Sequence, residues 1–237
     1  MAVYTFPVDE SEQDRELNGH QVRSQRSTRL LIQAAGDLIA ENGYANMTLA
    51  LVGERAGYSR GLATARFGSK GKLLDALVDH IVNRWNVVSV VPRTEGRSGL
   101  DALIILLTAI RDQYDRDPRL LRVLYALIFE ALGPVEELRV RFVQFNREAR
   151  ASVVAMIERG IADGSIVPGT DPDVEAQAIV AALRGVGYQW RLAPGEFDPV
   201  PALDHLIATT RARLSAVRRG ARAPRRTTRP RPRSARR

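Results

Sequence analysis

The chain has 237 residues, enough for one small and one medium-sized domain, with ordinary globular fractions of 45% hydrophobic and 26% charged side chains. It contains no cysteine, which excludes disulfides, thiol catalysis and cysteine-bound metals. No apolar run approaches the roughly 18 residues of a membrane span, and the first residues lack a secretion-signal pattern. We therefore expect a cytoplasmic protein without a membrane partner.

The formal net charge of +8 is unevenly distributed along the chain. Residues 218–237 contain ten arginines and no acid, whereas the rest of the chain holds 25 basic and 27 acidic residues. Within that remainder, residues 20–72 carry eight basic and three acidic side chains. This local excess favours a DNA-binding module near the beginning of the chain over a generally basic protein.

The sequence predicts helices over most of the chain, beginning after about residue 22. Residues 1–22 are polar, acidic and aperiodic, and we interpret them as a flexible arm. Apolar residues then recur at spacings of three and four to about residue 217, with Gly and Pro at segment ends, which predicts an all-α fold. The first helix is expected from Ser24 to Glu41, with Asn42-Gly43 as its stop.

The stretch from Thr48 to Leu74 has the order of a helix-turn-helix. Its predicted N-caps are Thr48, Ser59 and Ser69, with Gly57 ending the first short helix, Arg60 to Phe67 forming the second, and a long helix following to about Val88. Two short helices joined by a tight turn allow the second one to enter the DNA major groove. We therefore expect an N-terminal three-helix DNA-binding domain over residues 23–70.

This stretch closely resembles the TetR family of bacterial transcription regulators. The family pattern is Gly-Tyr or Gly-Phe, then Thr, Ala-Gly and Phe-x-x-Lys-x-x-Leu, and the chain supplies it at Gly43-Tyr44, Thr48, Ala56-Gly57, Phe67, Lys70 and Leu73. The resemblance implies a homodimeric regulator, more commonly a repressor than an activator. It also implies two partners, namely a double-stranded palindromic DNA operator and a small-molecule effector that releases the protein from it.

The resemblance also implies which residues contact DNA. Thr48 and Lys70 are expected to hold phosphates. Thr64 stands where the family usually has a phosphate-binding Tyr, and because its hydroxyl reaches less far, Arg66 is the alternative donor. The rest of the predicted contact set is Ser59, Arg60, Gly61, Leu62 and Ala63, with Arg60 alone able to bind guanine through two hydrogen bonds. For Arg23, Arg26 and Arg29, DNA contact and ordinary solvent exposure stay open as alternatives.

Residues 71–217 are expected to form a larger helical ligand-binding and dimerisation domain. Helices are predicted near residues 100–115, 118–132, 134–163, 173–192 and 199–217. The fourth of these is rich in small residues, namely Ala176, Ala178, Ala181, Ala182, Gly185 and Gly187, and the last supplies Leu203, Leu206, Ile207, Thr210 and Leu214. Two such helices per subunit predict a four-helix dimer interface. Packing within one subunit is the alternative.

Aromatic residues of the middle helices are candidates for the effector site. A mostly apolar cavity with a few polar anchors suits a small molecule, and we select Tyr125, Phe129, Phe142 and Phe145 as its lining. Core packing is the alternative role for each of them. Trp85, on the long fourth helix, either couples this site to the DNA-binding domain or only seals the junction.

Other functions find less support. The three histidines, His20, His80 and His205, lack metal-binding spacing, and no phosphate-cradling glycine loop is present, so we expect no enzyme, metal site or cofactor. A dimeric architectural DNA-binding protein without a ligand remains the alternative function. Residues 218–237, rich in Arg and Pro, are predicted to be disordered. They either add phosphate contacts or form a solvated extension without a dedicated role.

Overall fold

The computed structural model describes residues 19–85 and 90–216, and secondary structure in these ranges is helical apart from one isolated β-bridge. The helices are α2 (Gly19–Asn46), α3 (Leu49–Arg55), α4 (Leu62–Phe67), α5 (Lys70–Trp85), α6 (Val91–Thr94), α7 (Gly99–Arg116), α8 (Pro118–Glu130), α9 (Glu136–Ala162), α10 (Pro172–Leu192) and α11 (Pro199–Leu214). Among the described helices, none is both long and apolar enough to cross a bilayer. The predicted all-α class is confirmed.

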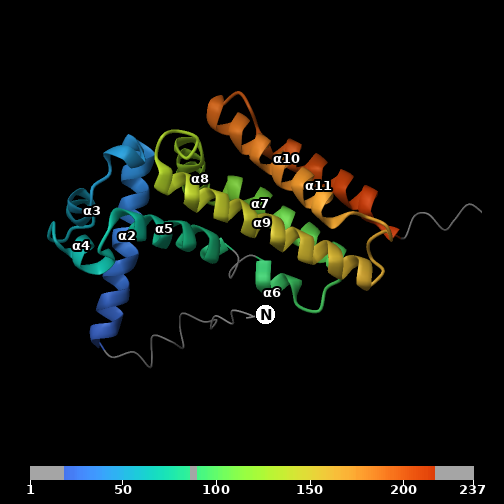
Figure 1. Ribbon diagram of the computed structural model, residues 1–237, viewed down its shortest axis with the longest axis horizontal. Helices are drawn as coiled ribbons and strands as arrows, with labels where there is room; N and C mark the ends of the chain where they lie inside the picture. Colours follow the sequence, from blue (N-terminus) through green and yellow to red (C-terminus); the bar gives the residue numbers. More distant parts are fainter. Residues whose placement is uncertain (1–18, 86–89, 217–237) are drawn as a thin grey trace, which may run out of the picture.

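The helices form a head and an elongated body. Helices α2 to α5 gather at one end, and α7, α9, α10 and α11 run side by side away from them (Figure 1). Helix α8 packs against α2 and therefore joins the two parts. We call α2 to α5 the head and α7 to α11 the body.

Two buried apolar clusters hold this arrangement together. The first joins the head to the body, because it combines residues of α2 to α5 with Val123, Leu127, Phe142 and others from α8 and α9. The second lies within the body and unites α7, α9, α10 and α11. The head is therefore not a separately packed unit.

The sequence predicts the stop of the first helix correctly but not its start. Helix α2 begins at Gly19, so residues 19–22 of the expected arm are helical, because nothing in that stretch interrupts a helix. Residues 1–18 lie outside the described residues, as does the basic stretch 218–237. The expected stop is confirmed at Gly43, whose backbone leaves the helical region with φ 78°, so α2 is kinked there and residues 44–46 form a separate short helical turn.

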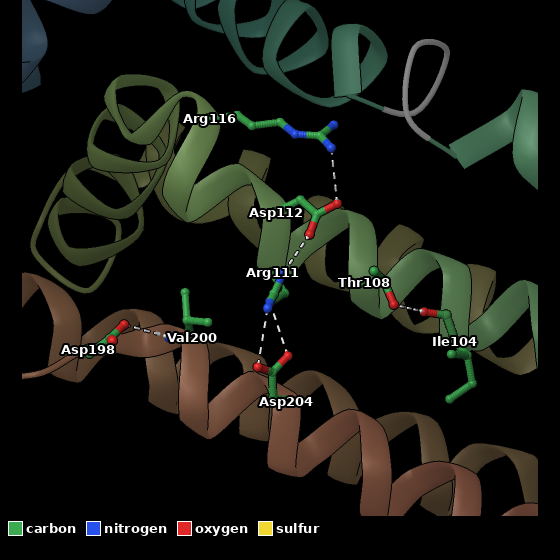
Figure 2. Close-up of polar contacts among 8 residues, drawn as sticks. All are labelled: Ile104, Thr108, Arg111, Asp112, Arg116, Asp198, Val200 and Asp204. Atoms are coloured by element: carbon green, nitrogen blue, oxygen red, sulfur yellow. Dashed lines mark hydrogen bonds and ion pairs between the residues drawn. The ribbon is translucent and has the colours of Figure 1, made fainter.

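Helix α11 is fixed to α7 by ion pairs as well as by apolar packing. Figure 2 shows Arg111 of α7 between Asp112 of its own helix and Asp204 of α11, at 3.1 Å from each carboxylate. Asp112 also pairs with Arg116 at 3.5 Å. The Val200 N–H donates to the Asp198 carboxylate at 2.9 Å, and Asp198 thereby caps the start of α11.

Some of the residues expected at a dimer interface are buried within the subunit, and others are exposed on its surface. Ala176 and Gly187 of α10 are buried within the subunit, and so are Leu203, Thr210 and Leu214 of α11. For these residues the expected interface role is wrong, because α10 turns them towards α8 and α9, and α11 turns them towards α7. Of the four remaining small residues, Ala182 is half-buried, and Ala178, Ala181 and Gly185 face outward.

Candidate nucleic-acid interface

The helix-turn-helix begins with a capped helix. The Leu51 N–H donates to the Thr48 hydroxyl at 3.2 Å, and Thr48 has the extended backbone of an N-cap residue. At the start of α5 the Lys72 N–H donates to the Ser69 hydroxyl at 3.2 Å. The predicted caps at Thr48 and Ser69 are confirmed, and Gly57, with φ 79°, supplies the left-handed turn after α3.

The predicted cap at Ser59 is wrong. Helix α4 begins at Leu62, and Gly61 precedes it without a side-chain capping bond. Ser59, Arg60 and Gly61 form the turn instead, and the Leu62 N–H donates to the Ser59 carbonyl at 3.1 Å. The chain needs these residues to cross from the end of α3 to the start of α4.

Gly53 of α3 allows this turn to lie directly on the helix. A Cβ atom at Gly53 would be 2.5 Å from the Ser59 carbonyl oxygen and 3.3 Å from the Arg60 Cα. The Tyr58 N–H donates to the Gly53 carbonyl at 2.9 Å, which ties the turn to the same residue. The sequence analysis missed Gly53, although a glycine inside a seven-residue helix is a signal of close backbone contact.

The orientation of α4 decides which side chains can reach DNA. Ala63 is 0% exposed and Leu62 packs partly against the same core, so Ala63 cannot contact a base. The predicted base contact by Ala63 is therefore wrong. Gly61, Thr64 and Ala65 are exposed and share the opposite side of the helix, as the helical period requires. Ala65, which the sequence analysis left out, takes the outward position.

The arginines near α4 are held by neighbouring side chains. Arg60 has 76% of its side chain exposed and pairs with Glu54 of α3. Arg66 turns back towards α2, where it donates to the hydroxyls of Ser24 at 2.6 Å and Ser27 at 3.2 Å. Arg60 thus lies on the surface beside the α4 face, whereas Arg66 connects α4 to the first helix.

A basic groove lies between α2 and the α3–α4 unit. It has a volume of about 530 Å³ and is lined by Arg23, Ser24, Arg26, Ser27, Leu30, Tyr58, Leu62 and Arg66. Three guanidinium groups and three hydroxyls suit a phosphate group. The structure therefore places Arg23 and Arg26 beside Arg66, while Arg29 is exposed on the same helix.

Lys70 lies where α2 and α5 meet. Its ammonium group donates to the Ala45 carbonyl at 3.2 Å and lies 4.2 Å from the centre of the Tyr44 ring. Burial lowers the pKa of Lys70 from its ordinary value, and the nearby Glu137 and Glu130 carboxylates partly oppose that shift. Lys70 is therefore positioned by the end of α2.

Two carboxylates of the body hold this end of α2. The Tyr44 hydroxyl donates to Glu137 of α9 at 2.7 Å, and the Tyr44 N–H donates to Glu130 of α8 at 2.7 Å. Burial raises the pKa of Tyr44 above its ordinary value, as does the bond to Glu137, so the hydroxyl stays a donor. We call Glu130 and Glu137 the carboxylate latch; no feature of the sequence indicated it.

The four candidate effector residues form two ring pairs. Tyr125 and Phe129 of α8 have ring centres 6.3 Å apart, and the Tyr125 hydroxyl donates to the Leu183 carbonyl of α10 at 3.1 Å. Phe142 and Phe145 of α9 are 5.8 Å apart and belong to the cluster that joins head and body. The structure brings each pair together on its own helix.

Polar groups lie beside these rings. The Arg184 guanidinium of α10 is 4.8 Å from the centre of the Phe145 ring and donates to the Asn146 side chain at 3.2 Å. Tyr114 is buried, and this burial raises the pKa of its hydroxyl, as does the neighbouring Tyr125. These groups could anchor one polar end of an otherwise apolar molecule. The side chain of Trp85 lies outside the described residues.

Two protein-family models match the chain. Residues 31–77 match the bacterial regulatory proteins of the tetR family, and residues 100–219, about half of the chain, match the C-terminal domain of BetI-type transcriptional repressors. Together the two matches cover most of the described head and body. They extend the resemblance from the helix-turn-helix to the body.

Individual relatives agree with this assignment. The HTH-type transcriptional regulator BetI of Agrobacterium fabrum is 27% identical over 179 residues, which cover 74% of this chain and 82% of the relative. The crystal structure of a TetR-family regulator from Rhodococcus sp. has a TM-score of 0.69 at 23% identity and covers 81% of this chain and 100% of its own. A SmeT–triclosan complex has a TM-score of 0.71 at 21% identity and covers 88% of this chain and 100% of its own. SmeT is a repressor from Stenotrophomonas maltophilia. The chain belongs to the TetR family of bacterial regulatory proteins, as a DNA-binding, non-enzymatic transcriptional repressor with a BetI-type C-terminal domain.

Proposed function

We propose that residues 23–70 read a near-palindromic operator through the outward side of α4, and that residues 71–217 dimerise and bind the effector, all in the cytoplasm. Arg60, Gly61, Thr64 and Ala65 face the base edges, with Ala65 suited to a thymine methyl group. Thr48, Arg66 and Lys70 hold phosphates on either side. The observation that carries this proposal is the exposure of Thr64 and Ala65 on a helix whose opposite side is buried.

The test is a binding measurement on duplexes selected by the purified protein from a random pool. Arg60→Ala is expected to lower the affinity for the selected duplex about 5- to 150-fold. This corresponds to the loss of one contact with two hydrogen bonds, worth about 1–3 kcal/mol. Arg116→Ala is the matched control, because Arg116 is another exposed arginine paired with a carboxylate, but in the body. If both variants bind like the unchanged protein, α4 does not read bases through Arg60.

Dimerisation is supported by an exposed apolar side of α10. Val174, Tyr188 and Leu192 are 60%, 50% and 67% exposed. Together with the outward Ala178, Ala181 and Gly185 they recur at alternating intervals of four and three residues, the spacing of a helix-packing seam. Paired with α11, whose Ala208 and Ala212 are also exposed, this side would build a four-helix interface with a second copy.

Light scattering on two variants tests the interface. Ala181→Arg places a charge in the seam and is expected to yield a folded monomer with weakened operator binding, because each half-site then binds alone. Ala155→Arg makes the same change at an exposed alanine of α9 and should leave the dimer intact. If the Ala181→Arg protein remains a dimer, the interface does not lie on this side of α10.

The effector is proposed to be a small, largely apolar molecule that enters between the ring pairs of α8 and α9. The support is the aromatic lining with Arg184 and Tyr114 as polar anchors, together with the relative SmeT, whose structure was solved with triclosan. In the described form the rings pack on one another, so binding requires them to move apart. Helices α8 and α9 carry the carboxylate latch, and their movement would displace the head.

This mechanism is a shift between two populations of the dimer. An effector that prefers the displaced head weakens operator binding by its difference in affinity for the two forms, typically about 1–3 kcal/mol. Thermal shifts with a library of apolar compounds provide the test. Compounds that raise the melting temperature should also lower operator affinity. A flat response across the library would favour the alternative of an architectural DNA-binding protein without a ligand.

A further inference from the structure

One half-buried arginine of the body is held in place without an acidic partner. Arg184 of α10 donates from its Nε–H to the Asn146 side-chain oxygen at 3.2 Å, and its guanidinium lies 4.8 Å from the centre of the Phe145 ring. Within residues 19–85 and 90–216, Arg184 forms no ion pair, and its two terminal amino groups form no hydrogen bond. Asn146 and Phe145 therefore fix the guanidinium but leave its charge unbalanced.

Other half-buried arginines of this chain show what a balanced charge looks like. Arg141 binds the carboxylates of Asp75 and Asp79, and Arg111 binds those of Asp112 and Asp204. Such pairing is usual because a charge withdrawn from water loses hydration that an acid restores. Arg150 and Arg191 are also half-buried without an ion pair in the described ranges. Arg184 differs from both in the buried polar groups that surround it.

Two buried tyrosines lie beside Arg184. Tyr114 of α7 and Tyr125 of α8 are only 7% and 4% exposed. The Tyr125 hydroxyl donates to the carbonyl of Leu183, the residue before Arg184, at 3.1 Å. Burial raises the pKa of Tyr114, Tyr125 adds to the rise, and the nearby Arg184 charge opposes it. The Tyr114 hydroxyl thus stays protonated at neutral pH and remains a hydrogen-bond donor next to the guanidinium.

These polar groups lie where the two buried clusters of the protein meet. Phe145 belongs to the cluster that joins head and body, whereas Tyr114 belongs to the cluster within the body. Arg184 is close to both of them. The site therefore combines aromatic rings from α7, α8 and α9 with one guanidinium from α10, which suits a molecule with an apolar part and one polar end.

The surrounding charges favour an anionic end over a cationic one. Residues 118–129 of α8 and 176–192 of α10 each contain two arginines and no acid. The next acid of α8, Glu130, accepts from the Tyr44 N–H, and Asp112 of α7 is paired with Arg111 and Arg116. The local potential at Arg184 is accordingly positive, and it attracts anions and repels cations.

We propose that the effector is an amphipathic carboxylic acid. Its carboxylate accepts from the two terminal amino groups of Arg184 and from the Tyr114 hydroxyl, and its apolar part lies against the rings of Tyr125 and Phe145. This assignment rests on the effector binding proposed above and names the chemical class of the ligand. A guanidinium binds a carboxylate in a planar arrangement with two hydrogen bonds, and the Nε–H can stay bonded to Asn146 meanwhile.

The position of Arg184 also connects such a ligand to the head. Its two contacts, Phe145 and Asn146, belong to α9, the helix that carries Glu137 of the carboxylate latch. An acid bound to Arg184 therefore acts on the interface between α9 and α10. This is the helix whose movement displaces the head in the proposed mechanism.

Compounds that share one carbon skeleton test the class of effector. Aryl and medium-chain alkyl carboxylic acids are compared with the primary amides and primary amines of the same skeletons, by thermal shift and by release of the selected duplex from the full chain. At least one acid should raise the melting temperature and release the duplex. Its amide and amine should bind about 10- to 100-fold more weakly, because the hydrogen bonds to a charged group are lost.

Variants of the full chain assign this preference to one side chain. Arg184→Gln should bind the acid no better than the amide, and Arg184→Lys, which keeps the charge but not the two-bond geometry, should keep part of the preference. Arg147→Gln is the matched control, since Arg147 is an exposed arginine next to Asn146, and it should respond like the unchanged protein.

Two results would overturn the proposal and leave the effector function intact. One is an amide or amine that binds as well as its acid, a comparison that needs only the unchanged protein. The other is a folded Arg184→Gln protein with an undiminished preference for the acid. The absence of any response to all three series of compounds would instead refute the proposed effector binding, and with it the assignment of the ligand.

Discussion

Replacing Gly53 by alanine tests the close contact on which the position of α4 depends. The new methyl group would lie 2.5 Å from the Ser59 carbonyl oxygen, where ordinary contacts begin near 3.4 Å. The obstacle is backbone, which cannot rotate away as a side chain can. The turn of residues 59–61 must therefore move by almost 1 Å, and the start of α4 must move with it.

The expected effects on stability and on DNA binding differ in size. Overpacking costs about 1–3 kcal/mol, but alanine gains about 1 kcal/mol over glycine inside a helix, so the free energy of unfolding falls by at most about 2 kcal/mol. Displacing α4 removes base contacts worth about 1–3 kcal/mol each. Gly53→Ala should therefore lower operator affinity at least tenfold while the melting temperature falls by only a few degrees.

Fluorescence anisotropy with a selected duplex and a thermal melt measure the two effects. Gly36→Ala is the control, since Gly36 is also a buried helical glycine, but its new Cβ would meet Leu77 at 3.6 Å, an ordinary contact. That variant should bind normally and melt slightly higher. Unchanged operator affinity in Gly53→Ala would refute the argument that this contact sets the position of the recognition helix.

Two further predictions concern the head–body junction and the far end of the body. Tyr44→Phe removes the hydroxyl that donates to Glu137 and should lower the free energy of unfolding by about 1 kcal/mol in urea titrations; no change would mean that this bond contributes nothing. The Ser165 hydroxyl and the Gly99 N–H hold the pKa of Asp163 below its ordinary value of 3.8, so its stabilisation is complete above that value and lost as pH falls through the lower folded pKa. Asp163→Asn should therefore be less stable than the unchanged protein near pH 7, with the difference shrinking below about pH 4; a difference independent of pH would contradict this assignment.

The features predicted correctly from the sequence are local ones. A threonine or serine before an apolar period predicts a capped helix start, and Thr48 and Ser69 have that role because capping involves only the next three residues. Gly43 and Gly57 likewise end helices by their own backbone conformation. Such signals do not depend on how the helices pack.

The features predicted wrongly or missed depend on packing. Ala63 and Ala65 are the same residue type two positions apart, and only the contact of α4 with the rest of the head decides which one faces outward. Ser59 has the chemistry of a cap but lies in a turn fixed by Gly53. The Tyr44–Glu137 bond joins residues 93 positions apart, a pairing that no local pattern encodes.

The same packing bears on how an effector signal could reach DNA. A domain boundary at residue 70 would divide one buried cluster. Leu73, Leu77 and Val78 of α5 belong to the same cluster as residues of α2, α8 and α9. Packed cores switch between discrete arrangements and do not deform continuously. A hinge between head and body would have to expose this cluster, at about 25 cal/mol for each Å² of apolar surface. Movement of the head together with α8 and α9 avoids that cost, and it keeps the carboxylate latch closed while the spacing between the two heads changes.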